Sequence, residues 1–171
     1  SFVVPQGGAL LLTGPNGAGK SSLMRALAGL LPVMTGTIAS QGRMAWLGHD
    51  NALKEHRSLI SELRWWAALD GAPEDRVAEA LALFDLAPLA DLPVRVLSSG
   101  QRRRAALARM WQAGADLWLL DEPTVGLDAA SVARLAALMA AHRAAGGAVV
   151  AATHVDLGLV DAIELRLGGK G

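Results

Sequence analysis

Residues 9–21 read Ala9-Leu10-Leu11-Leu12-Thr13-Gly14-Pro15-Asn16-Gly17-Ala18-Gly19-Lys20-Ser21. The first five residues predict a short buried strand, because they form an apolar run that ends at a glycine. From Lys20 onward, apolar residues recur at helical spacing to Leu31, and Pro32 should end the helix. The loop between them fits the pattern G-x-x-x-x-G-K-[ST], which requires a preceding strand and a following helix. The stretch therefore predicts a phosphate-binding loop.

Each part of this loop suits a phosphate ligand. The glycines let backbone N–H groups surround phosphate oxygens without Cβ clashes, and the start of the helix adds a partial positive charge. Lys20 offers a charge for the β- and γ-phosphates, and the Ser21 hydroxyl is placed for Mg²⁺. The alternative, a glycine-rich turn without a ligand, does not need this strand–loop–helix setting. The predicted nucleotide-binding residues are Gly14, Pro15, Asn16, Gly17, Ala18, Gly19, Lys20, Ser21 and Ser22.

The rest of the chain predicts alternating strands and helices. Residues 117–120 and 148–152 are two more buried strands, and residues 35–48 should form two short strands with turns. Predicted helices cover residues 58–69, 73–86, 100–113 and the stretch from an N-cap at Asp128 to Ala145, with a loop over 87–97. Buried strands that alternate with helices indicate an α/β fold with a mostly parallel sheet and helices on both faces.

The composition excludes several classes of protein. A chain of 171 residues with 52% hydrophobic and 19% charged residues predicts one folded domain. Sixteen Lys and Arg residues balance sixteen Asp and Glu residues, so no net field favours nucleic acid. The absence of cysteine excludes disulfides and thiolate metal sites. No apolar run is long enough to cross a bilayer.

A pair of acids follows the predicted strand at residues 117–120. Asp121 ends the strand, and in nucleotide hydrolases with such a phosphate-binding loop this carboxylate helps to hold Mg²⁺. Glu122 comes next, where its carboxylate can polarise a water that attacks the γ-phosphate. The plainer alternative is that the acids only open a loop. The phosphate-binding loop favours the catalytic interpretation.

A second anion-binding helix start lies about eighty residues after the first. Ser98, Ser99, Gly100 and Gln101 precede a helix that carries Arg102, Arg103 and Arg104. One molecule has no evident need for two phosphate sites so far apart in sequence, whereas a head-to-tail dimer does. Each ATP would then lie between one chain's phosphate-binding loop and its partner's Ser-Gly-Gln turn. The alternatives are an ordinary N-cap and a solvated or nucleic-acid-facing arginine patch.

These motifs, in this order, resemble the ATP-binding cassette (ABC) family over nearly the whole chain. Residues 97–101 resemble its signature Leu-Ser-Gly-Gly-Gln, with Ser99 replacing a glycine. Residues 125–128 resemble the loop whose aspartate, here Asp128, helps to pair the subunits. The resemblance implies that His154 contacts the γ-phosphate and orients Glu122 and water. It also implies a P-loop NTPase fold over residues 1–171, a helical subdomain at approximately residues 50–97, and the absence of the family's N-terminal β part, as in a fragment.

One departure points to a subfamily. His49 stands where the family usually has a glutamine, and residues 47–49 with 52–54 resemble the ATP-binding subunit of the bacterial haem exporter of cytochrome c biogenesis. That resemblance implies ATP and Mg²⁺ as cofactors, catalytic roles for Glu122, His154 and His49, and Mg²⁺ ligation by Ser21 and Asp121. It implies a dimer at the cytoplasmic face of the bacterial inner membrane, bound to the transporter's integral membrane subunits. Neither nucleic acid nor haem is expected to bind the chain directly.

Other interpretations remain open at this stage. The chain could serve another small ABC exporter, act as a soluble clamp on nucleic acid or ribosomes, or be catalytically inert. The sequence does not decide which molecule is transported, or whether the output is haem transport or release of a haem chaperone. It also does not decide between a homodimer and a heterodimer. Trp65 and Trp66 lie on one predicted helix, one expected in packing and one partly exposed on a partner groove. Trp46, Trp111 and Trp118 are expected in the core.

Overall fold

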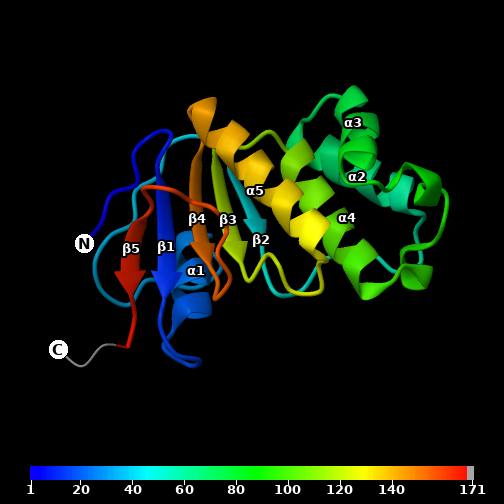
Figure 1. The fold of residues 1–171 in the computed structure, drawn as a ribbon. Helices are drawn as coiled ribbons and strands as arrows, with labels where there is room; N and C mark the ends of the chain where they lie inside the picture. Colours follow the sequence, from blue (N-terminus) through cyan, green and yellow to red (C-terminus); the bar gives the residue numbers. More distant parts are fainter. Residues whose placement is uncertain (169–171) are drawn as a thin grey trace. The chain divides into compact units, whose positions relative to one another are not determined.

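The computed structural model describes residues 1–168 and contains two compact units (Figure 1). The sheet unit comprises residues 1–49, 115–124 and the chain from Ala133 onward. The helical unit comprises residues 50–114 and 125–132. Each unit has its own buried core, and each is described by itself below.

The sheet unit is built on five parallel strands in the order β2-β3-β4-β1-β5. The strands are β1 (Ala9–Thr13), β2 (Met44–Leu47), β3 (Leu117–Asp121), β4 (Ala148–Ala152) and β5 (Ile163–Arg166). The central strands β1, β3 and β4 are apolar up to their last residues, as is typical of parallel strands covered on both faces. The predicted α/β class with a parallel sheet is confirmed.

The register of the central strands aligns their carboxyl ends. Ala152 at the end of β4 pairs with Leu12 of β1 on one side and with Asp121 of β3 on the other. Neighbouring strands lie about 4.8 Å apart, so Leu12 and Asp121 are separated by about two strand spacings. The loops that leave β1, β3 and β4 therefore begin at one edge of the sheet.

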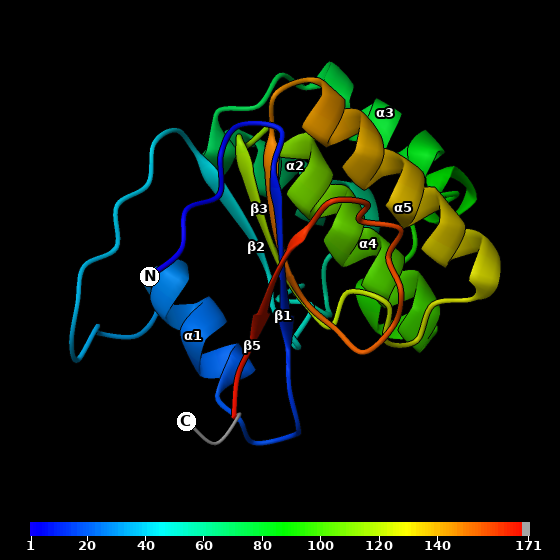
Figure 2. The same cartoon turned by 60° about the vertical axis from the view of Figure 1, so that its left-hand side comes forward.

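Helices cover both faces of this sheet (Figure 2). Helix α1 (Lys20–Leu27) packs Met24 into a core with Leu10, Leu12, Leu119 and Val150. Helix α5 (Ala129–Ala144) lies on the opposite face, where Leu135 and Met139 are buried and His142 stacks on Trp118. Because side chains alternate along a strand, Trp118 and Leu119 face opposite layers.

The helical unit packs three helices around its own core. They are α2 (Leu59–Asp70), α3 (Asp75–Leu83) and α4 (Ser99–Gln112), with short 3-10 helices at Ala87–Leu89 and Val94–Val96. The interior is mainly apolar, and the amide nitrogen of the buried Gln112 donates to the Leu63 carbonyl at 2.7 Å. The guanidinium of Arg76 lies 4.4 Å from the ring centre of Trp111.

Several local predictions were wrong. The helix from Lys20 ends at Leu27 because Gly29, with φ of 71°, closes it in a Schellman motif, in which the N–H of Leu30 donates to the Arg25 carbonyl at 2.8 Å. Only Met44–Leu47 of residues 35–48 forms a strand, and β5 was not predicted. Two 3-10 helices occupy part of the predicted 87–97 loop.

The tryptophan predictions were partly wrong. Trp118 is buried at 3% exposure, but Trp46 and Trp111 are only half-buried. Trp65 is 41% exposed and Trp66 is half-buried, in line with the expected division of the pair. Trp46 packs against one sheet core from β2, which is an edge strand of the sheet within residues 1–168.

Candidate active site

The phosphate-binding loop connects β1 to α1 at the carboxyl edge of the sheet. Its turns depend on left-handed glycines, with φ of 133° at Gly14, 80° at Gly17 and 94° at Gly19. A Cβ on Gly14 would lie 2.3 Å from the Leu167 carbonyl oxygen, so the start of the loop also requires glycine because the backbones lie close. Pro15 and Asn16 are exposed, Ala18 is half-buried, and Ser21 and Ser22 lie exposed in the first turn of α1.

Lys20 forms hydrogen bonds to the backbone of its own phosphate-binding loop. Lys20 is buried at 8% exposure, and its ammonium donates to the carbonyl of Gly14 at 2.7 Å and to that of Pro15 at 3.1 Å. These bonds hold the charged end of Lys20 over the loop rather than in solvent. An ammonium with three donors can keep such contacts and still meet an anion in the loop.

Asp121, Glu122 and His154 come together at the ends of β3 and β4. Asp121 is buried at 4% exposure as the last residue of β3. Glu122 has φ of 46°, and its N–H donates to the Ala152 carbonyl at 2.8 Å. Its carboxylate Oε1 lies 3.5 Å from His154 Nε2. The structure thus brings two of the predicted catalytic side chains into direct proximity.

His49 leaves the neighbouring strand β2. It lies two residues beyond Leu47, which pairs with Leu120 of β3, and it is exposed. The parallel register places the end of β2 at the same sheet edge as Asp121. His49 is therefore on the correct edge, while no contact that the structure describes joins it to Glu122 or His154.

The signature residues begin α4 in the helical unit. Ser98 is the N-cap: its Oγ accepts from the Gln101 N–H at 3.2 Å, and the Gln101 side chain accepts from the Ser98 N–H at 2.8 Å. This capping box fixes both side chains. The hydroxyl of Ser98 still has its proton to donate, and Ser98 and Ser99 are exposed.

Gly100 and Asp128 belong to the same unit. A Cβ on Gly100 would lie 2.9 Å from the Gly126 carbonyl oxygen, so the signature turn lies directly on the loop before Asp128. The Asp128 carboxylate accepts from the Ser131 N–H at 2.8 Å and caps α5. Sequence reasoning missed the close approach of the Gly126 carbonyl to Gly100. The available signal was the glycine at position 126, which has φ of 79°.

Mg²⁺ would need hard oxygen ligands. Ser21 and Asp121 supply a hydroxyl and a carboxylate at the same sheet edge, which suits this ion. Within residues 1–168 no group of three His, Cys, Asp or Glu side chains could hold a metal by itself. Water or nucleotide oxygens would have to complete the shell, as they commonly do for Mg²⁺.

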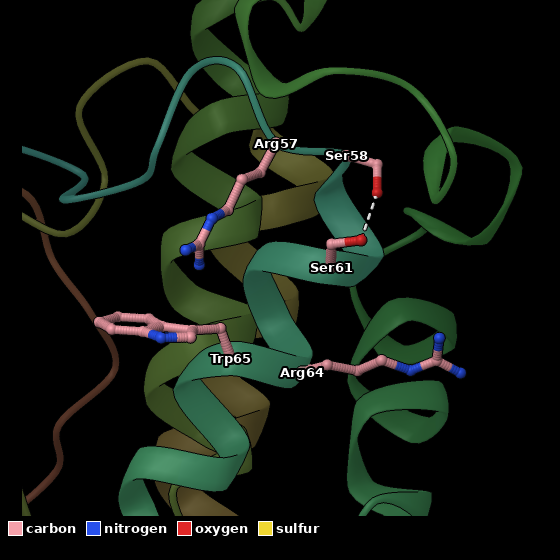
Figure 3. A pocket seen from close by; sticks show the side chains of 5 residues that line it. All are labelled: Arg57, Ser58, Ser61, Arg64 and Trp65. Carbon is pink, nitrogen blue, oxygen red and sulfur yellow. Dashed lines mark hydrogen bonds between the residues drawn. The ribbon is translucent and has the colours of Figure 1, made fainter.

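A shallow hollow lies on the surface of α2 in the helical unit (Figure 3). It is lined by Arg57, Ser58, Ser61, Arg64 and Trp65. The Ser58 hydroxyl lies 2.8 Å from that of Ser61, and Arg57 lies 5.2 Å from the ring centre of Trp65. Leu69, one turn beyond Trp65, is 63% exposed. The surface combines an aromatic face with two cationic side chains.

Comparison with known proteins shows the family and the fold of the chain. Residues 1–125 match the family described as ABC transporter. The chain belongs to the ABC transporter family. The cytochrome c biogenesis ATP-binding export protein CcmA of Gluconobacter oxydans is 52% identical over 159 residues, covering 93% of this chain and 74% of that protein. The CcmA protein of Rhodospirillum rubrum is 50% identical over 179 residues, covering 98% of this chain and 77% of that protein.

A solved ATP-binding subunit of an ABC transporter has a TM-score of 0.87 at 25% identity, over 99% of this chain and 80% of the other. Family membership makes this chain an ATP-binding subunit whose ATP hydrolysis is coupled to transport, in company with membrane subunits. The predicted resemblance to the cytochrome c biogenesis subfamily is confirmed. No helix within residues 1–168 is both long and apolar enough to span a membrane.

Proposed function

We propose that Glu122 and His154 act together on the water that attacks the γ-phosphate of ATP. The observation that carries this is the 3.5 Å approach of the two side chains beside the loop that follows β3. Glu122 accepts a proton from the water, and His154 holds the carboxylate and the γ-phosphate in line. Residues 14–22 bind the phosphates, with the backbone N–H groups of all but Pro15 available as donors and Lys20 as the counter-charge.

The nucleotide carries Mg²⁺ when it binds. Ser21 and Asp121 would hold the ion, which would supply positive charge against the charge that develops on the phosphates. Asp121 suits this role because it is buried and its strand is fixed by pairing on both sides. His49, which follows β2, would order a water near the ion.

Two copies of the chain form the working ATPase as a head-to-tail dimer. Ser98, Ser99, Gly100 and Gln101 of one copy bind the ATP held by the other copy's phosphate-binding loop. The capping box supports this role, because it presents the Ser98 hydroxyl and the first N–H groups of α4 to an incoming phosphate. Asp128, which caps α5 beside the loop that touches Gly100, lies at the subunit boundary.

The transporter exports haem, or releases a loaded haem chaperone, during cytochrome c maturation. Relatives about half identical to this chain bear the name cytochrome c biogenesis ATP-binding export protein. The chain sits peripherally on the cytoplasmic face of the bacterial inner membrane, where the hollow on α2 receives a cytoplasmic segment of a membrane subunit. Trp65 and Leu69 offer this segment an apolar contact.

A trapped-complex experiment tests the proposal. The tagged protein carrying Glu122→Gln is expressed in its host, supplied with ATP and Mg²⁺, and purified with its membrane partners. Recovery of cytochrome c maturation proteins, dependent on ATP, is the expected result. Recovery of an unrelated permease would overturn the haem assignment, and normal ATP hydrolysis by the variant would overturn the role of Glu122. Trp65→Ala should reduce recovery of the partner without changing ATP binding.

A further inference from the structure

The two residues that follow β5 lie against the phosphate-binding loop. We call Leu167 and Gly168 the post-β5 segment. The Leu167 N–H donates to the Thr13 carbonyl at 2.8 Å, so the hydrogen bonds between β5 and β1 continue just past the end of β5 (Figure 2). The Leu167 carbonyl oxygen occupies the space that a Cβ on Gly14 would need. All of these residues belong to the sheet unit.

Gly168 lies beside two further residues of the loop. A Cβ on Gly168 would lie 3.5 Å from the Cδ and Cγ atoms of Pro15, which is an ordinary contact, but only 3.1 Å from the Cβ of Ala18. Carbon atoms that are not bonded to each other attract best at about 3.5–4.0 Å, so the second approach is too close. A glycine at position 168 therefore lets the post-β5 segment lie directly on the loop.

The loop residues that contact the post-β5 segment include those that hold Lys20. The ammonium of Lys20 donates to the Gly14 carbonyl at 2.7 Å and to the Pro15 carbonyl at 3.1 Å. Leu167 lies against Gly14, and Gly168 lies against Pro15. A shift of the loop backbone at these two residues would therefore move the acceptors of the Lys20 ammonium.

A side-chain hydrogen bond also fixes β5 to the strand that leads into the loop. The Thr13 hydroxyl donates to the Glu164 carboxylate at 2.7 Å, immediately before Gly14. Among the strands within residues 1–168, β5 pairs only with β1. The position of the post-β5 segment is therefore set by β1, and the segment supports the loop at a third place besides β1 and α1.

We propose that Gly168 is a positioning residue for ATP binding, because its lack of a side chain lets the post-β5 segment hold the phosphate-binding loop, and through it Lys20, in the geometry that binds phosphate. A binding site must hold its groups to within about 0.5 Å, so a small shift of the loop weakens the contacts. Gly168 acts through the loop and makes no contact with phosphate in this scheme. The inference rests on the proposed phosphate-binding role of residues 14–22.

A double-mutant cycle tests the inference by titration with a fluorescent ATP analogue. Gly168→Ala should raise the Kd about fivefold, because the new Cβ displaces the loop at Ala18. In the Ala18→Gly background, which lacks the opposing methyl group, Gly168→Ala should raise the Kd less than about twofold. Gly158→Ala is the matched control: Gly158 is also left-handed, with φ of 63°, but its new Cβ would lie 4.0 Å from Ala136. This control should keep the wild-type Kd.

Hydrogen exchange in the nucleotide-free protein gives a second readout that requires no ATP. The amides of residues 16–20 should exchange faster in Gly168→Ala than in Gly158→Ala, and this difference should disappear in the Ala18→Gly background. Exchange and Kd equal to those of Gly158→Ala would overturn the inference. An equal increase in Kd with and without Ala18→Gly would also overturn it, because the contact with Ala18 would then not be the cause.

A second pair of variants serves if Gly168→Ala fails to fold. Thr13→Val removes the hydroxyl that donates to Glu164, whereas Thr13→Ser keeps one. The amides of residues 16–20 should exchange faster in Thr13→Val than in Thr13→Ser, and equal rates would overturn the inference. Failure of the proposed function has a different signature: Lys20→Met would bind ATP as tightly as wild type while the differences in exchange persist.

Discussion

His154 and Glu122 lie side by side, with imidazole Nε2 3.5 Å from carboxylate Oε1. One strand positions both residues. The Ala152 carbonyl at the end of β4 accepts the N–H of Glu122 at 2.8 Å, and His154 follows Ala152 by two residues. This bond holds Glu122 in its left-handed conformation, with φ of 46°. The two side chains are therefore expected to behave as one functional unit.

Replacing Glu122 with glutamine should reduce ATP turnover by about 10²- to 10⁴-fold, the usual contribution of a general base. ATP binding should persist, because Glu122 is absent from the phosphate-binding loop. Phosphate release and nucleotide affinity measure the two effects. If His154 acts through Glu122, adding His154→Ala to the Glu122→Gln variant should lower ATP turnover only slightly further. Glu79→Gln, an exposed carboxylate on α3, is the control and should leave turnover unchanged.

Replacing Lys20 with methionine should weaken ATP binding by at least tenfold. The variant loses the buried ammonium that donates to the Gly14 and Pro15 carbonyls, and with it the charge for the phosphates. Titration with a fluorescent ATP analogue measures the affinity. Lys54→Met removes an exposed lysine and should bind as wild type does. Equal affinity of the Lys20 variant and wild type would contradict the proposed phosphate site.

Much of the sheet unit could be predicted because its signals are local. The apolar runs at β1, β3 and β4 and the glycine pattern after β1 fall within short windows of sequence. β5 escaped prediction because only Leu165 of Ile163–Arg166 is half-buried, and the strand lies on the edge of the sheet. Its pairing with β1 is a tertiary contact that its own composition does not reveal.

The candidate active site also combines features predictable from local sequence with features that depend on tertiary contacts. The glycine loop and the acids at the end of β3 were predictable from spacing, whereas the approach of His154 to Glu122 depends on strand order. Arg103 was noted only as one of three consecutive arginines. Its burial, and its bond to Asn51 52 positions away, depend on how α4 packs within the helical unit. No short-range pattern carries that information.

Replacing Gly100 with alanine should destabilise the helical unit and impair turnover. The added Cβ would approach the Gly126 carbonyl oxygen to 2.9 Å, and backbone cannot move aside as a side chain can. Overpacking of this kind costs about 1–3 kcal/mol of unfolding free energy. Urea unfolding and ATPase assays measure both effects. Ser99→Ala, one residue earlier and exposed, should change stability by less than about 0.5 kcal/mol.

His142 should make the sheet unit sensitive to acid. Its ring stacks on Trp118 with ring centres 4.0 Å apart and an interplanar angle of 7°, and its Nε2 is buried without a hydrogen-bond partner among the described residues. Burial lowers the pKa of His142, and this outweighs contacts with Ala148 and Asp116 that raise it. The unfolded chain therefore binds more protons than the folded chain at this position.

The sign of the pH effect follows from that difference. The stability that neutral His142 provides is complete above its unfolded pKa, about 6.5, and is lost as the pH falls below that value. One group changes the free energy of unfolding by at most about 1.4 kcal/mol per pH unit. Urea unfolding should show that the free energy of unfolding falls less between pH 7.5 and pH 5 for His142→Phe than for wild type. His56→Phe, which alters an exposed histidine, should retain the wild-type loss. An equal loss in the His142 variant would show that His142 does not cause this acid sensitivity.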